Sequence, residues 1–242
     1  MQESEIKFGT DGWRGVISDD FTFENVRRVA QAIASYYNSG LQTQNSKLKI
    51  AVGYDTRFLS DRYAQIVSEV LSQNKIDVIL SDRSTPTPML SFTVRNKKLT
   101  AGVMITASHN PGEYNGIKIK TQTGGAAGVE VTKEIERLML RTQRHLPVRQ
   151  AGKDTRTQGK INKTDLTKDY IKFLRSYIDL KKLKNAKFKV LVDAMYGSGR
   201  SFIREVLKDS KIELEFMRSE INPSFGGIRP EPIVENLQAT IV

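Results

Sequence analysis

Short apolar runs alternate with segments of helical periodicity along the first half of the chain. Apolar residues recur three or four positions apart within 23–37 and 60–73, which predicts two amphipathic helices. Compact runs rich in β-branched residues at 48–52, 77–80 and 103–105 predict buried strands. Strands and helices that alternate in this way favour an α/β fold, in which helices cover both faces of a mixed, mainly parallel sheet.

The same alternation returns in the second half of the chain. It predicts a helix at 165–178, strands at 188–192 and 212–217, and a further helix that begins near Ile233. We therefore expect a second α/β/α domain, and the chain stops just inside its last predicted helix. The predicted segments are domain I at 1–145, a basic linker at 146–163, and an incomplete domain II at 164–242.

Positive charge concentrates around this linker. The chain has 38 Lys and Arg against 27 Asp and Glu, a net charge of +11, and residues 141–189 alone hold 15 Lys and Arg against 4 Asp. The rest of the chain is therefore balanced. Basic segments that bind nucleic acid commonly carry interleaved aromatic residues, and the linker has none. A solvated face that steers anionic substrates is favoured, and nucleic-acid binding is the weakest alternative.

The remaining composition indicates a water-soluble protein of the cytoplasm. The chain has no cysteine, so neither disulfides nor thiolate metal sites are expected. The first residues lack the apolar core of a secretory leader, and no apolar run approaches the length of a membrane span. No membrane partner is therefore expected.

A polar loop between two short strands carries the residues best suited to chemistry. Ser108 follows the apolar run 103–105. His109 is the next residue, and Lys118 lies in the middle of the following short strand. Reacting groups of open α/β sheets lie at such strand ends, and Pro111 stiffens the loop. We interpret Ser108 as a nucleophile that carries a phosphoryl group, with an ordinary β-hairpin as the alternative.

A glycine-rich stretch near the N-terminus is a second candidate for anion binding. Residues 7–15, KFGTDGWRG, contain three glycines and are not expected to form regular structure. Backbone N–H groups of such a stretch can close around an anion, and Arg14 would add a bidentate guanidinium. The alternative is a tight turn that leads into a strand at Val16.

Two further strand ends carry polar residues for which a structural role is favoured. Asp55 is expected to cap the next helix and to pair with Arg57. Ser60 is expected to cap the same helix. Residues 193–199, DAMYGSG, lie where a strand, a glycine loop and a helix meet, as in some phosphate sites. They lack the spacing of the dinucleotide-binding and P-loop motifs, so a structural turn is favoured.

Four strings in domain I resemble the signatures of one family. They are TASHNP at 106–111 with NGIK at 115–118, FGTDGWRG at 8–15, GYDTR at 53–57, and TPTP at 85–88. On these strings the chain resembles the N-terminal half of the four-domain α-D-phosphohexomutases, the phosphoglucomutase and phosphomannomutase type. The resemblance implies an intramolecular phosphotransferase that interconverts hexose 1-phosphate and hexose 6-phosphate through a phosphoserine.

The resemblance also implies a role for each residue of the polar loop. Ser108 becomes the phosphoserine and, through its phosphate, a ligand of Mg²⁺. Lys118 is the candidate general base or acid for the sugar hydroxyl, and a hexose bisphosphate is the intermediate and activator. Arg14 and Asn110 contact phosphate. His109 contacts phosphate or a hydroxyl, with a His-Asn turn held by backbone hydrogen bonds as the alternative.

The metal site that the resemblance implies is incomplete in this sequence. In the family, three aspartates of a DGDxDR loop join the phosphoserine oxygen on Mg²⁺, and no such string occurs here. We therefore expect this fragment to bind no metal tightly and to be inactive alone, whereas the intact enzyme would use Mg²⁺. The alternative function is a non-catalytic module that binds a sugar phosphate or a partner.

Overall fold

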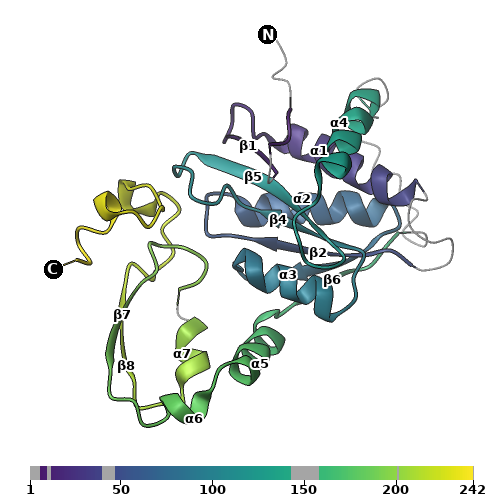
Figure 1. The fold of residues 1–242 in the computed structure, drawn as a ribbon. Helices are drawn as coiled ribbons and strands as arrows, with labels where there is room; N and C mark the ends of the chain where they lie inside the picture. The colour runs from purple at the N-terminus through teal and green to yellow at the C-terminus, as the bar shows by residue number, and fades with distance from the viewer. Residues whose placement is uncertain (1–5, 10–11, 40–46, 143–157, 201, 242) are drawn as a thin grey trace.

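The computed structural model describes residues 6–9, 12–39, 47–142, 158–200 and 202–241. Six strands form one mixed sheet in the order β1-β5-β4-β2-β3-β6 (Figure 1). They are β1 (Trp13–Val16), β2 (Lys49–Tyr54), β3 (Asp77–Ser81), β4 (Ala101–Ile105), β5 (Tyr114–Thr121) and β6 (Ile161–Thr164). Strands β4, β2, β3 and β6 are parallel, and β5 is antiparallel to both of its neighbours. The expected mixed, mainly parallel sheet is confirmed.

Helices cover both faces of this sheet. They are α1 (Phe23–Asn38), α2 (Ser60–Gln73), α3 (Thr87–Asn96) and α4 (Val129–Thr142). On one face, α1, α2 and α4 share an apolar core that includes the fully buried Ile33, Leu71 and Ile135. On the opposite face, Leu90 of α3 packs with Met104 of β4. Burial of these apolar stripes is the main force that holds the layers together.

The direction of winding reverses at β2. The chain adds β3 on one side of β2 through α2, and after α3 it places β4 on the other side of β2. The loops after β2 and β4 therefore leave the same edge of the sheet side by side. Ligands of open α/β sheets bind at this edge, at such a switch point. Arg57 follows β2 and Ser108 follows β4, so both lie there.

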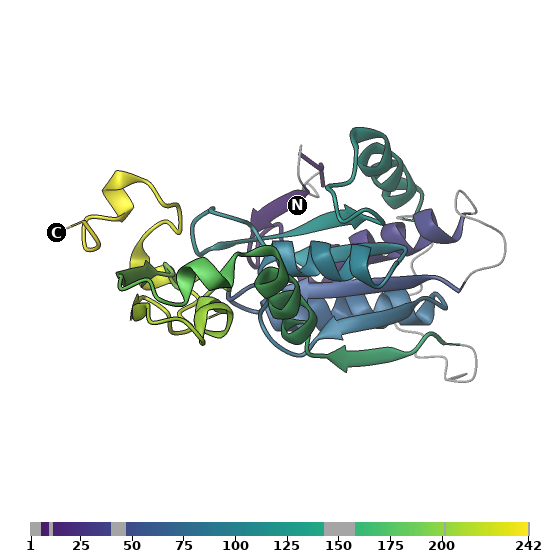
Figure 2. The same cartoon turned by 60° about the horizontal axis from the view of Figure 1, so that its bottom comes forward.

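The second unit is built on two parallel strands, β7 (Lys189–Asp193) and β8 (Glu213–Met217). Its helices are α5 (Thr167–Tyr177), α6 (Leu180–Leu183) and α7 (Phe202–Leu207). It lies beside the carboxyl edge of the large sheet (Figure 2). There Thr56 Oγ1 donates to the Tyr196 carbonyl at 2.8 Å. Within the described ranges, no helix is both long and apolar enough to cross a membrane.

Three local predictions are wrong. Residues 161–163 of the predicted linker form most of β6, because their backbone pairs with the edge of β3. Residues 13–15, expected to be irregular, belong to β1. In this strand buried Trp13 packs on Phe21, with ring centroids 4.7 Å apart. The helix expected from Ile233 is a single 3₁₀ turn (Val234–Asn236), since its apolar side chains have no core to cover.

The linker prediction is only partly open to comparison with the structure. Its residues 146–157 lie outside the described residues. The proposed limit at 145 stays a prediction, whereas β6 extends the large sheet to Thr164.

Candidate active site

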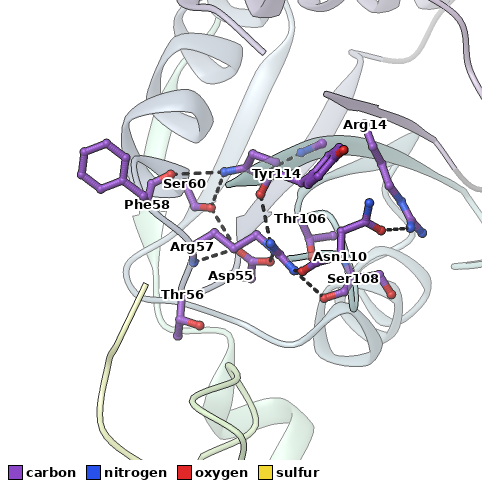
Figure 3. Close-up of polar contacts among 12 residues, drawn as sticks. Arg14, Asp55, Thr56, Arg57, Phe58, Ser60, Thr106, Ser108, Asn110 and Tyr114 are labelled. Carbon is purple, nitrogen blue, oxygen red and sulfur yellow. Dashed lines mark hydrogen bonds and ion pairs between the residues drawn. The ribbon is translucent and has the colours of Figure 1, made fainter. Parts of the chain in front are cut away.

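Ser108 lies in the loop that joins β4 to β5, which we call the serine loop (residues 106–113; Figure 3). The residue is exposed, and its φ of 59° lies in the left-handed region that non-glycine residues rarely adopt. Its N–H donates to Thr106 Oγ1 at 3.0 Å, and the Asn110 N–H donates to the Ala107 carbonyl at 3.1 Å. The serine loop is therefore a defined turn that presents its serine to solvent.

Arg57 holds the serine loop from its buried side (Figure 3). Nη1 donates to the carbonyls of Pro111 at 2.7 Å and Tyr114 at 3.0 Å. Nη2 donates to those of Ser108 at 2.9 Å and Asn110 at 2.6 Å. The Arg57 side chain is 0% exposed, so these four carbonyls replace water as its acceptors. One guanidinium thus fixes the course of the whole loop.

Asp55 completes the surroundings of Arg57. Its Oδ2 lies 3.2 Å from Arg57 Nε, and its Oδ1 accepts from the Arg57 N–H at 3.0 Å and from Ser60 Oγ at 2.8 Å. Burial raises the pKa of Asp55, and the charge of Arg57 opposes that shift. The predicted Asp55–Arg57 pair is confirmed.

The predicted helix cap at Ser60 is wrong. Leu59 occupies the N-cap position of α2 in a left-handed conformation, with φ of 59°, and makes no side-chain cap hydrogen bond. Ser60 is already the first helical residue, and its hydroxyl donates to Asp55 Oδ1 instead of capping the helix. Asp55 does not occupy the N-cap position either. Its carboxylate accepts from the Arg57 N–H, before the helix, and from the Ser60 hydroxyl, at the first helical residue.

Arg14 reaches the serine loop from β1. Its Nη1 donates to Asn110 Oδ1 at 2.5 Å (Figure 3). Arg14 lies opposite Gly116 in the β1–β5 pair, and a Cβ on that glycine would lie 3.2 Å from Arg14 Cγ. Gly116 therefore leaves room for the arginine to cross β5. The side-chain oxygen of Asn110 is thus engaged by Arg14, whereas its amide nitrogen is a donor.

Lys118 lies on the same face of the sheet as Arg14. It is two positions beyond Gly116 on β5, so Arg14 and Lys118 are diagonal neighbours across the β1–β5 pair. Lys118 is 7% exposed and lies opposite Met104 of β4. His109 is exposed. The structure thus joins Arg14 directly to Asn110, two residues after Ser108 in the serine loop, and places Lys118 beside Arg14 on the same sheet face.

The described carboxylates do not form a Mg²⁺ site. Divalent magnesium is held by several oxygen ligands, usually carboxylates and phosphate. Among the residues that the structure describes, no group of three or more His, Cys, Asp or Glu could hold a metal ion. Asp55, the carboxylate under the serine loop, is already engaged by Arg57 and Ser60. The residues that the structure describes therefore do not fit the metal that the family resemblance implies.

The second unit contributes a pocket beside the serine loop. The pocket has a volume of about 720 Å³. Its lining residues are Phe58, Pro111, Gly112, Glu113, Pro223, Ser224, Gly227, Ile228 and Arg229. Ser108, Arg14 and Lys118 do not line it. The pocket is therefore distinct from the space in front of the serine hydroxyl.

The junction at residues 193–199 is occupied by internal contacts. Arg218 donates through Nε to Asp193 Oδ1 at 2.8 Å and through Nη2 to Oδ2. The Met195 N–H also donates to Asp193 Oδ1, at 3.0 Å. These bonds, with Arg218 foremost, lower the pKa of Asp193 to about 2. The contacts agree with the structural role favoured from the sequence.

Comparison with known families decides the identity of the fold. The profile of phosphoglucomutase/phosphomannomutase alpha/beta/alpha domain I matches residues 5–145, and that of domain II matches residues 168–242. The chain belongs to the phosphoglucomutase/phosphomannomutase family. The resemblance to the α-D-phosphohexomutases is therefore confirmed, and the serine loop lies in the family's domain I.

Individual relatives agree with this assignment. The chain is 32% identical to the phosphoglucomutase of Staphylococcus aureus (strain MRSA252) over a 240-residue alignment. The match covers 94% of this chain and 41% of the relative. A Thermus thermophilus protein, provisionally named a phosphomannomutase, is 35% identical, with a TM-score of 0.82 over 99% of this chain and 52% of that one.

A third relative shows the same fold at lower identity. A phosphoglucomutase/phosphomannomutase family protein of Burkholderia thailandensis is 21% identical, with a TM-score of 0.78 over 98% of this chain and 49% of that chain. The chain thus spans less than half the length of the curated relative from S. aureus and about half of these two solved structures.

Proposed function

We propose that this chain is the phosphoserine-bearing part of a cytoplasmic phosphohexomutase that interconverts hexose 1-phosphate and hexose 6-phosphate. The observation that carries the proposal is the exposed Ser108 at the switch-point edge of the sheet, in a loop fixed by Arg57 and reached by Arg14. Family membership supports the class of reaction, since the S. aureus relative is named a phosphoglucomutase. The expected partner is a small sugar phosphate.

The proposed half-reaction is a single phosphoryl transfer. Such transfers depend chiefly on positioning and on neutralisation of phosphate charge. Ser108 Oγ forms a bond to phosphorus of a hexose bisphosphate while the bond from phosphorus to the sugar oxygen breaks. The products are phosphoserine and a hexose monophosphate, and the serine proton ends on the departing sugar oxygen. The reverse step, to the other hydroxyl of the sugar, completes the interconversion.

The neighbouring side chains supply charge and proton transfer. Arg14 and the Nδ2 amide of Asn110 would bind the phosphate oxygens. Lys118 would act as the general base or acid for the sugar hydroxyl. His109 would contact phosphate or a sugar hydroxyl from the exposed end of the loop.

Mg²⁺ in the intact enzyme would neutralise charge on the transferred phosphoryl group. The described carboxylates of this chain do not form that site. We therefore propose that the chain alone binds no metal tightly and has no mutase turnover. We expect the chain to retain a slow transfer of one phosphoryl group from excess donor to Ser108. This single step needs fewer protein groups than mutase turnover does.

The test is the mass of the chain after long incubation with excess glucose 1,6-bisphosphate and Mg²⁺. One added phosphate, mapped to the peptide that contains Ser108 and absent from Ser108→Ala, is the expected result. No phosphate on Ser108 would overturn the donor role. Conversion of glucose 1-phosphate to glucose 6-phosphate by residues 1–242 at ordinary mutase rates would overturn the proposed inactivity.

Binding without catalysis is the second candidate. The lack of a carboxylate cluster among the described residues favours it. Calorimetric titration with glucose 6-phosphate separates the two functions. Equal binding by the wild-type chain and Ser108→Ala, with no phosphate transferred in the mass experiment, would favour the non-catalytic module.

A further inference from the structure

The ring of Phe225, in the second unit, covers the guanidinium of Arg57. Arg57 Cζ lies 4.9 Å from the centroid of the Phe225 ring, which is the geometry of a cation–π contact. Phe225 is 3% exposed although it lies in a long loop between β8 and the end of the chain. The arginine that fixes the serine loop is therefore enclosed by domain I on one side and by domain II on the other.

The segment that carries Phe225 is a braced turn, which we call the Phe225 loop (residues 222–228). The Phe225 N–H donates to the Asn222 carbonyl at 2.9 Å, and the Gly227 N–H donates to the Ser224 carbonyl at 3.0 Å. Phe225 itself has φ of 54°, in the left-handed region. A turn that holds a bulky residue in this region does so only when its surroundings enforce it.

The Phe225 loop also touches the serine loop directly. A Cβ built on Gly112 would lie 3.2 Å from Ser224 Cα and 3.3 Å from the Pro223 carbonyl oxygen. The two loops are thus in close backbone contact at Gly112, which has no side chain to separate them. The Thr56–Tyr196 hydrogen bond, one residue before Arg57, joins the same two units.

These contacts link the second unit to the conformation of Ser108. The left-handed backbone of Ser108 costs free energy that the surroundings must offset. Arg57 contributes to that compensation through its bonds to the Ser108 and Asn110 carbonyls. Without the Phe225 ring, water would reach the guanidinium and compete for its donors, so the bonds to the serine loop would weaken.

We infer that Phe225 is a positioning residue for phosphoryl transfer at Ser108, acting through Arg57 on the backbone of the serine loop. The inference rests on the proposed function for its effect on rate. Its structural part, the coupling of the Phe225 loop to the serine loop, stands on the contacts alone. Docking of domain II thereby sets how well the serine of domain I is presented.

The test compares Phe225→Leu with Phe216→Leu in the full chain. Phe216 is a matched control, because its ring also lies under an arginine, with Arg204 Cζ 4.6 Å from the centroid, but on β8 away from the serine loop. Loss of the cation–π contact predicts that the maximal rate of Ser108 phosphorylation by glucose 1,6-bisphosphate falls about 3- to 30-fold. The half-saturating donor concentration should stay unchanged, and Phe225→Tyr, which keeps the ring, should restore the rate.

Amide hydrogen exchange of the peptide 106–116 is the second readout. We expect faster exchange in Phe225→Leu and wild-type exchange in Phe216→Leu and Phe225→Tyr. Wild-type rate and exchange in a folded Phe225→Leu chain would overturn the inference. If circular dichroism shows that Phe225→Leu does not fold, Phe225→Met, which fills a similar volume without a ring, takes its place.

The exchange measurement also separates this inference from the proposed function. If the wild-type chain takes up no phosphate on Ser108, the proposed function fails, and exchange alone decides the coupling. Faster exchange of 106–116 in Phe225→Leu would then still support the link between the loops, and unchanged exchange would overturn it.

Discussion

Nη2 of Arg57 donates to the main-chain carbonyl of Ser108 across 2.9 Å, although the two residues lie 51 positions apart in the chain. This bond joins the loop after β2 to the loop after β4, at the edge where the winding of the sheet reverses. The same guanidinium binds three more carbonyls of that region. The exposed serine is therefore supported by a buried charge that has no contact with solvent.

Replacement of Arg57 should destabilise domain I severely. Arg57→Ala leaves Asp55 buried without its cation and four carbonyls without their donor, so the free energy of unfolding should fall by about 3–5 kcal/mol. Urea unfolding followed by circular dichroism measures the change. Arg83→Ala is the control, because that side chain is 51% exposed and its pair with Asp82 should contribute less than about 1 kcal/mol. Equal losses in the two variants would contradict the role of Arg57.

Gly116 should not tolerate a side chain. A Cβ at this position would lie 2.5 Å from the Trp13 carbonyl oxygen and 2.7 Å from that of Thr106, both of them backbone atoms. Gly116→Ala should therefore lower the free energy of unfolding by about 1–3 kcal/mol. Gly125→Ala is the matched control, since its Cβ would meet only hydroxyls at 3.5 Å or more. Thermal unfolding checks both, and an unchanged melting temperature for Gly116→Ala would refute the close packing.

Local sequence patterns predict most of the large sheet and its helices, because each element has its own apolar period. One strand that they miss entirely is β6, whose residues Ile161-Asn162-Lys163-Thr164 contain one large apolar side chain and therefore carry no strand signal. Its conformation is set by the edge of β3, to which it pairs in parallel. A four-residue edge strand is thus a tertiary effect that periodicity does not reveal.

Some features of the candidate site were likewise predictable from the sequence, and others were not. Ser108 and Lys118 are candidates from their residue types and positions, and Arg14 becomes one through the family resemblance of its string. The carbonyl contacts of Arg57 and the cover by Phe225 were missed, because donor and acceptors come together only in the folded chain. A lone arginine after a strand and a lone phenylalanine in a proline-rich loop have no local pattern that predicts such a contact.

Acid should weaken the second unit through Asp193. Its pKa of about 2 in the folded chain lies below the ordinary 3.8, so its pair with Arg218 stabilises the fold above about pH 4. That contribution, about 2 kcal/mol, should disappear as the pH falls from 4 to 2. Asp193→Asn lacks the titrating group, and its free energy of unfolding should lose about 2 kcal/mol less than wild type over this range.

The pH experiment has a control on the same strands. Glu213→Gln removes a carboxylate from an exposed pair with Lys189, at 3.6 Å, and should keep the wild-type pH profile. Urea unfolding at each pH, followed by circular dichroism, supplies the free energies. Parallel profiles for wild type and Asp193→Asn would show that the Asp193–Arg218 pair does not contribute as expected.

Arg14 should act on phosphoryl transfer through the geometry of its guanidinium. Arg14→Lys keeps the charge but loses the planar guanidinium, which can donate to Asn110 and to a phosphate oxygen at the same time. Ser108 phosphorylation by glucose 1,6-bisphosphate should therefore slow about 10-fold. Arg27→Lys, at an exposed position of α1, should keep the wild-type rate. The time course of the added phosphate mass provides the measurement.

A double variant tests whether Asn110 carries the effect of Arg14. If Arg14 acts through its hydrogen bond to Asn110, Asn110→Ala alone should slow the transfer. The double variant should then be little slower than Arg14→Lys, because both changes remove the same contact. Two independent effects would instead multiply in the double variant. That result would show that Arg14 acts independently of Asn110, through its own contact with the phosphate alone.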